Sequence, residues 1–192
     1  CVILSPANKF SWSVVLLWGG IMNALLQLDR ATPKFKLMLA PHPGDANYQK
    51  NKEVYNDFVL LSPVPTLLID KEMMPTSEFL PAADLVIESC STAGIEAAHL
   101  RIPVIDYLTG IWLERWEGLT GSAKWELCEL GASKAVYNDP RLLLHRIIQF
   151  SKPDNHHRQE LLKRQVAAYP QPPKQGATVE IIVSTIRALA QI

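Results

Sequence analysis

Short apolar runs alternate with longer segments along most of this chain, and this alternation predicts its fold. The runs of strand length are residues 2–4, 35–40, 58–61, 85–87, 104–107 and 135–137. The segments between the first five runs suit helices, which we place at 11–29, 46–56 (a polar helix or a loop), 72–81 and from about 92 onwards. Strands that alternate with helices indicate βαβ units. We therefore expect an α/β fold, a three-layer Rossmann-like parallel sheet with helices on both faces.

The pattern becomes more helical after residue 108. Residues 111–120 are interpreted as an irregular loop or short helix, and 122–130 as a helix that ends at Gly131, a good C-terminal cap. Further helices are expected at 140–150, where Pro140 takes a favoured first position, at 155–169 and at 177–190. We interpret residues 1–192 as one domain that includes this helical tail, from about 140 to 192.

The most apolar segment, residues 12–28, raises the question of a membrane span or a signal peptide. Asn23, Gln27 and two adjacent glycines interrupt it, and its apolar run is shorter than the ~20 residues that a span needs. No basic region precedes it and no A-x-A site follows it. We therefore interpret it as a buried helix. Because the chain starts inside a strand-like run without an initiator Met, we also expect it to be a fragment of a longer protein.

Composition narrows the classes of function. Apolar residues make up 48% of the chain, which argues against general disorder. Nineteen basic and nineteen acidic side chains cancel, so no overall field attracts nucleic acid. The three cysteines, Cys1, Cys90 and Cys128, form neither a metal-ligand pair nor a disulfide framework. We expect a cytoplasmic protein with no bound metal and no cofactor.

Polar residues follow three of the predicted strands, where a parallel sheet binds its ligands. Residues 5–9 are as consistent with an ordinary loop as with a binding loop. His42 precedes a proline, which restricts its backbone, so its imidazole could donate to a phosphate or act as a general acid. The same residues, 42–45, also suit a simple turn.

The third cluster, after the strand at 85–87, is the most informative. Its hydroxyls and small residues lie where a helix begins, and a helix N-terminus favours a phosphate. The candidate binding residues are Ser89, Ser91, Thr92, Ala93, Gly94 and Glu96. Glu96 could accept hydrogen bonds from a ribose diol, or it could cap the helix or compensate its dipole.

Residues 83–105, with a small-residue turn, a Glu-Ala helix and a Pro-Val strand, resemble the C-terminal, nucleotide-sugar-binding domain of GT-B fold proteins. UDP-N-acetylglucosamine 2-epimerase and related glycosyltransferases belong to this group, and the His-Pro pair at 42–43 is similar to their His-Pro element. The resemblance implies that Ser91, Thr92 and Gly94 approach a diphosphate and that Glu96 binds the ribose of a UDP-sugar. It also implies an N-terminal acceptor domain elsewhere in the gene product, without which we expect weak binding and no turnover.

Two alternatives stay open. His42 with Ser89 and Ser91 also resembles CDP-glycerol glycerophosphotransferases and some sialyltransferases, which would imply a CMP or CDP leaving group. A non-catalytic interaction domain is the second alternative, because tryptophans and charges alternate over residues 112–125. Epimerase activity is not supported, since residues 88–91 replace the Asp-Ser-Gly-Gly turn of that enzyme. A homodimer and peripheral membrane association of the full-length protein also stay open.

Overall fold

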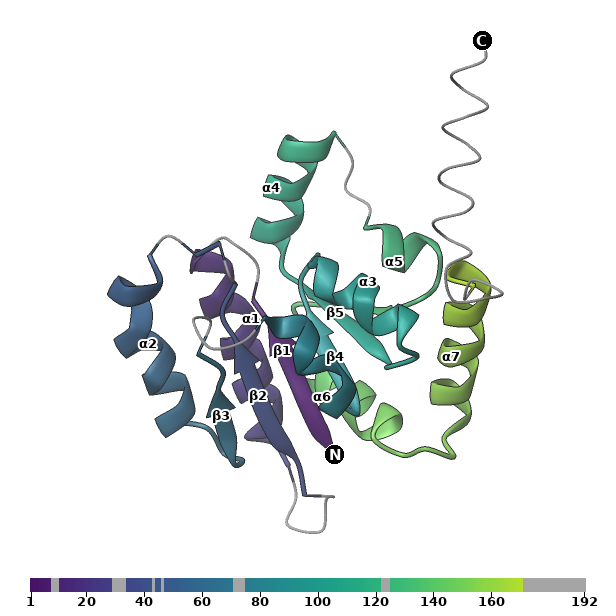
Figure 1. The fold of residues 1–192 in the computed structure, drawn as a ribbon, viewed down its shortest axis with the longest axis horizontal. Helices are drawn as coiled ribbons and strands as arrows, with labels where there is room; N and C mark the ends of the chain where they lie inside the picture. Colours follow the sequence, from purple (N-terminus) through teal and green to yellow (C-terminus); the bar gives the residue numbers. More distant parts are fainter. Residues whose placement is uncertain are drawn as a thin grey trace.

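A computed structural model describes residues 1–7, 11–28, 34–42, 44–45, 47–70, 75–121 and 125–170, and these form an α/β fold around one parallel sheet (Figure 1). The strands are β1 (Val2–Pro6), β2 (Lys36–Ala40), β3 (Thr66–Leu68), β4 (Leu85–Glu88), β5 (Val104–Leu108) and β6 (Lys134–Tyr137). Their spatial order is β3-β2-β1-β4-β5-β6, and every neighbouring pair is parallel. This is the strand order of the Rossmann fold. The predicted fold class is confirmed.

Helices cover both faces of the sheet. One face is covered by α1 (Ser11–Leu25), α2 (Tyr48–Leu60) and α6 (Pro140–Phe150), and the other by α3 (Thr92–His99), α5 (Glu126–Glu129) and the short 3₁₀ helices η1 (Thr76–Glu78) and η2 (Leu80–Ala82). The helix α7 (His156–Ala168) packs against both α3 and α6, and α4 (Gly110–Thr120) follows β5. Figure 1 shows α4 beyond the carboxyl ends of the strands.

The core lies in two layers, because successive residues of each strand point to opposite faces. On β1, Ile3 packs with α1 and α6, whereas Leu4 packs with α3 and α5. Burial on both faces explains why the strands appear in the sequence as continuous apolar runs rather than as alternating ones.

The segment at 11–25 is the buried helix that the sequence predicted. Leu17, Trp18 and Ile21 of α1 are at most 2% exposed. Gly20 allows the helix to approach the ring of Tyr107, since a Cβ atom there would lie 2.3 Å from a ring carbon. Among the helices that the structure describes, none combines the length and the apolar character that crossing a bilayer requires.

Two expectations about local structure need correction or refinement. Residues 58–60 end α2 instead of forming a strand, because Phe58 packs edge-on against Trp18 of α1 at 5.5 Å between ring centroids. The third strand is β3, a few residues later. Residues 110–120 form a regular helix, which Thr109 caps at one end and left-handed Gly121 ends at the other. The helix expected at 177–190 lies outside the described residues.

Candidate functional site

A cavity of about 180 Å³ opens at the carboxyl ends of β1 and β4. The chain passes from β1 through β2 to β3 on one side and continues from β4 on the other, so the strand order reverses between β1 and β4. Open α/β sheets bind their ligands at such a switch point. The lining residues are Pro6, Ala7, His42, Pro75, Thr76, Ser77, Ser91, Thr92, Ala93 and Glu96.

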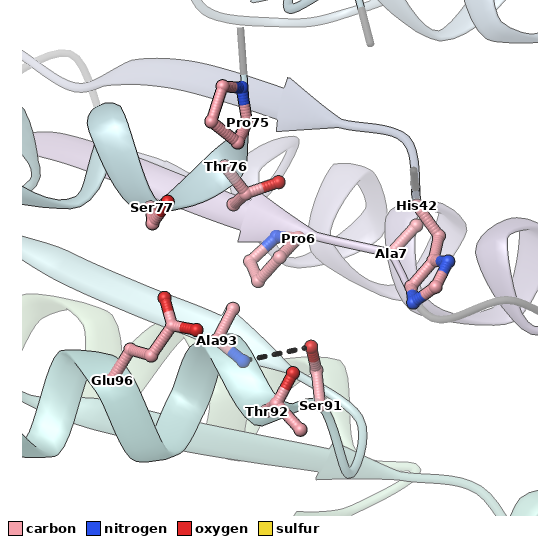
Figure 2. A pocket seen from close by; sticks show the side chains of 10 residues that line it. All are labelled: Pro6, Ala7, His42, Pro75, Thr76, Ser77, Ser91, Thr92, Ala93 and Glu96. Atoms are coloured by element: carbon pink, nitrogen blue, oxygen red, sulfur yellow. Dashed lines mark hydrogen bonds between the residues drawn. The ribbon is translucent and has the colours of Figure 1, made fainter. Parts of the chain in front are cut away.

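The N-terminus of α3 forms one wall of this cavity (Figure 2). Ser91 is the N-cap residue, and its Oγ accepts a hydrogen bond from the backbone N–H of Ala93 at 3.3 Å. Within the described part of the chain, the backbone N–H of Thr92 makes no hydrogen bond, so it can donate to a ligand. Both the helix dipole and the N–H of Thr92 favour an anion here.

His42 stands at one end of the cavity, after β2 (Figure 2). Its Nδ1 accepts a hydrogen bond from the backbone N–H of Gly44 at 2.9 Å, which places the proton of a neutral imidazole on Nε2. The same turn is anchored by Asp45, which is 3% exposed and accepts a hydrogen bond from the hydroxyl of Tyr55 at 2.6 Å. The backbone N–H of Asp45 also donates to the carbonyl of His42 at 3.0 Å, so His42, Gly44 and Asp45 belong to a turn, and His42 lines the cavity from it.

The opposite wall was not predicted. Thr76 and Ser77 of η1 face Ser91 and Thr92 of α3 across the cavity, as Figure 2 shows. The only signal in the sequence is the small polar run after Pro75, which sequence reasoning assigned to a short helix without a function. In the chain, η1 lies in the connection from β3 to β4, and in the fold it contacts α3. This contact is a long-range feature that a local pattern does not contain.

Two of the candidate residues do not line the cavity. The hydroxyl of Ser89 donates to the backbone carbonyl of Tyr107 at 2.5 Å. Gly94 faces inward, because a Cβ atom there would lie 2.7 Å from Oε1 of Glu88 and 2.9 Å from Cδ1 of Leu127. The structure thus gives Gly94 a packing role beneath α3. In the 5–9 segment, Pro6 and Ala7 line the cavity, and residues 8–9 lie outside the described part.

The side chains beneath the α3 turn are buried acids and thiols. Burial, followed by the charge of Glu88, raises the pKa of Cys90, so this thiol is protonated at neutral pH. Glu88 is fully buried at the end of β4, and burial and the charge of Asp106 raise its pKa well above the usual range. Among the described residues, no three His, Cys, Asp or Glu side chains gather in an arrangement that could hold a metal ion.

The tryptophans between residues 112 and 125 pack mainly against one another. Trp112 is 2% exposed and its ring lies 5.8 Å from that of Trp116, which in turn meets Trp125 edge-on at 5.3 Å. They form a small core with Cys90 and Leu108 under α4. Their alternation with charged residues therefore reflects packing beneath α4, and it gives the interaction-domain alternative less support than the sequence suggested.

No protein-family model matches the chain, and no curated protein matches its sequence. Solved structures do. MurG from Acinetobacter baumannii is 17% identical, with a TM-score of 0.53 over 95% of this chain and 49% of its own length. A protein described as a UDP-N-acetylglucosamine 2-epimerase from Listeria monocytogenes is 15% identical, with a TM-score of 0.61. The match covers 100% of this chain and 46% of that protein. A variant of the wall teichoic acid polymerase TagF is 15% identical, with a TM-score of 0.57, and the match covers 100% of this chain and 45% of the TagF chain.

The chain spans about half the length of each of these proteins. At such low identity the likeness concerns the fold alone, and it agrees with the resemblance that the sequence motifs indicated. Taken together, the strand order and the structural neighbours show that this chain has the Rossmann-like fold of one half of a GT-B protein.

Proposed function

We propose that this chain is the donor-binding half of a GT-B glycosyltransferase and that its preferred ligand is a UDP-sugar. The observation that carries the proposal is the cavity at the switch point between β1 and β4, where the α3 N-terminus, His42 and Glu96 meet. A sheet crevice with a helix N-terminus suits a nucleoside diphosphate. Glycosyl transfer from such a donor requires stabilisation of the leaving diphosphate, which these groups can supply.

Each wall of the cavity has a role in this proposal. The N–H of Thr92 and the hydroxyls of Thr92 and Ser91 would donate to phosphate oxygens, and Nε2 of His42 would donate from the other end. The carboxylate of Glu96, one turn further along α3, would accept hydrogen bonds from a ribose diol. In this arrangement the donors lie near the phosphates and the acceptor lies near the sugar, which matches the charges of the ligand.

The small volume of the cavity indicates that this chain forms only part of a ligand site. About 180 Å³ is less than the ~300–1,000 Å³ of typical small-molecule sites. We propose that an N-terminal acceptor domain closes over the cavity and supplies a further wall, as the half-length match to the structural neighbours suggests. The three cysteines are free, which fits the cytoplasmic location that forms part of this proposal.

A CDP-linked donor is the second candidate. Two observations favour it: the cavity is rich in hydroxyl groups, and one structural neighbour is TagF soaked with CDPG, at 16% identity and a TM-score of 0.56. A CMP donor belongs to the same class. A direct comparison of uridine and cytidine nucleotides is therefore needed to identify the base.

Thermal unfolding in the presence of UDP, CDP, UMP and CMP tests both candidates. A ligand at ten times its Kd stabilises the folded state by about 1.4 kcal/mol, which corresponds to a rise in Tm of roughly 3–6 °C for a chain of this size. We expect the diphosphates to raise Tm more than the monophosphates, at millimolar concentration. The nucleotide with the larger effect identifies the base.

Matched variants show whether the effect comes from this cavity. His42→Ala and Glu96→Gln should reduce the shift, whereas His145→Ala and Glu117→Gln, at exposed positions on α6 and α4, should leave it unchanged. The proposal fails if no nucleotide changes Tm, or if all four variants respond like the parent chain.

A further inference from the structure

Two buried carboxyl groups lie side by side under the first turn of α3. Glu88 ends β4, and Asp106 is its register partner on β5, so the two side chains extend from the same face of the sheet. Both residues are 0% exposed. The proposed ligand contacts do not include either of them.

The hydrogen bonds of Glu88 connect three parts of the structure. Its Oε2 accepts from the backbone N–H of Ser91, the cap of α3, and its Oε1 accepts from the indole N–H of Trp125 at 3.2 Å. Gly94 leaves the space that this carboxyl occupies, since a Cβ atom there would overlap Oε1. Glu88 therefore supports the turn that carries the proposed phosphate donors from below.

Only one of the two carboxyl oxygens of Asp106 accepts a hydrogen bond from the described residues. Its Oδ2 accepts from the hydroxyl of Ser133 and from the thiol of Cys128, which lies 3.0 Å away. Its Oδ1 is buried and has no donor among the described residues. A proton on Glu88 would provide that donor, and it would avoid two adjacent buried negative charges, which are costly in a medium of low dielectric constant.

The groups around the pair supply no compensating positive charge in the described contacts. They are the thiols of Cys90 and Cys128 and, on the side of Asp106, the phenol of Tyr169, which is itself hydrogen-bonded to Glu126. Burial raises the pKa of both thiols, so they stay neutral. A proton is therefore the available means of reducing the charge of the pair.

We propose that Glu88 and Asp106 share one proton and act as positioning residues, holding the turn at Ser91 in place while they limit the negative charge beneath the α3 N-terminus. The ligand part of this inference rests on the proposed function, whereas the shared proton and the position of the turn do not. The reasoning follows from charge: a second negative charge under α3 would oppose an anion bound at its N-terminus. Glu88→Gln preserves an acceptor for Ser91 and offers an N–H to Asp106, so it should replace the protonated acid.

Infrared spectroscopy in D₂O at pH 8 tests the shared proton without any ligand. The parent chain should show the carbonyl stretch of a protonated carboxylic acid, and Glu88→Gln should lack it. In Asp106→Asn the band should disappear at a lower pH than in the parent chain, because the neighbouring carboxylate is gone. A parent spectrum without the band, or an Asp106→Asn band with unchanged pH dependence, overturns the shared proton.

Amide hydrogen exchange tests the positioning role. Exchange at the N–H of Ser91 should be faster by at least about tenfold in Glu88→Ala, corresponding to about 1.4 kcal/mol, and close to the parent rate in Glu88→Gln. Equal rates in all three proteins overturn this role. If Glu88→Ala does not fold, Glu88→Met, which keeps the volume of the side chain without an oxygen acceptor for Ser91, takes its place in the comparison. Titration with inorganic pyrophosphate completes the test: Glu88→Gln should bind with the parent affinity. If pyrophosphate fails to bind the parent chain, the proposed function fails, while the infrared and exchange results still decide this inference.

Discussion

Replacing Gly94 by alanine distinguishes a packing role from a ligand-binding role at this position. The new methyl group would point toward Glu88 and Leu127, both 0% exposed, and away from the cavity. Its distance to Cδ1 of Leu127 would be 2.9 Å, about 0.6 Å less than the ~3.5 Å of a favourable carbon–carbon contact. One of the buried groups must therefore move, or α3 must shift away from the sheet.

Two opposing effects determine how much Gly94→Ala changes the free energy of unfolding. Alanine in place of glycine stabilises a helix by about 1 kcal/mol, and overpacking a core costs about 1–3 kcal/mol. Gly118 of α4 provides the matched control, because a Cβ atom there meets nothing within 4 Å. Gly118→Ala should gain up to about 1 kcal/mol, so the two variants should differ by about 1–3 kcal/mol, or roughly 2–12 °C in Tm.

Urea unfolding followed by far-ultraviolet circular dichroism measures this difference directly. Gly94→Ala should have the lower midpoint, with a slope equal to that of Gly118→Ala. If Gly94→Ala is as stable as Gly118→Ala, or more stable, the inward packing of Gly94 against Glu88 is refuted.

Three other perturbations have defined outcomes. Gly20→Ala should lose about 1–3 kcal/mol against the ring of Tyr107, whereas the adjacent Gly19→Ala, with open space around it, should gain up to about 1 kcal/mol; thermal melts compare them. Asp139→Ala should cost about 1 kcal/mol in urea unfolding, because its side chain caps two backbone N–H groups of α6. The raised pKa of Glu88 means that the folded state keeps a proton that the unfolded state loses, so the free energy of unfolding should fall as pH rises from about 4.5; in Glu88→Gln this part of the pH dependence should disappear.

The sequence was sufficient to predict most of the sheet. The buried strands at 85–87 and 104–107 are apolar on both faces except at Asp106, which is close to the pattern of a central parallel strand. The pattern was misleading at 58–61, where Phe58 in the last turn of α2 packs on Trp18 while Leu60 and Leu61 are exposed, and at β3, whose three residues are too few to produce a distinct signal. A short apolar run can be assigned to a strand or to a helix only from its length, and both of these segments are too short for that.

The candidate site was predicted in part for a similar reason. Helix capping and the turn at 42–45 are local features, so the sequence located His42, Ser91 and Thr92 at the ends of their strands. The contribution of Thr76 and the pairing of Glu88 with Asp106 depend on strand register and on packing between distant segments. A single sequence contains no direct record of register in strands that are buried on both faces.

The central claim is that a nucleoside diphosphate binds at the carboxyl ends of β1 and β4. Backbone NMR of the chain titrated with UDP and with CDP tests it most directly. The account predicts that the largest chemical-shift changes occur at Thr92, Ala93 and Glu96 of α3, at His42 and at Ser77. Changes that instead centre on another hollow, such as the apolar one lined by Val2, Met38 and Leu67, or a chain that does not respond to either nucleotide, would contradict it.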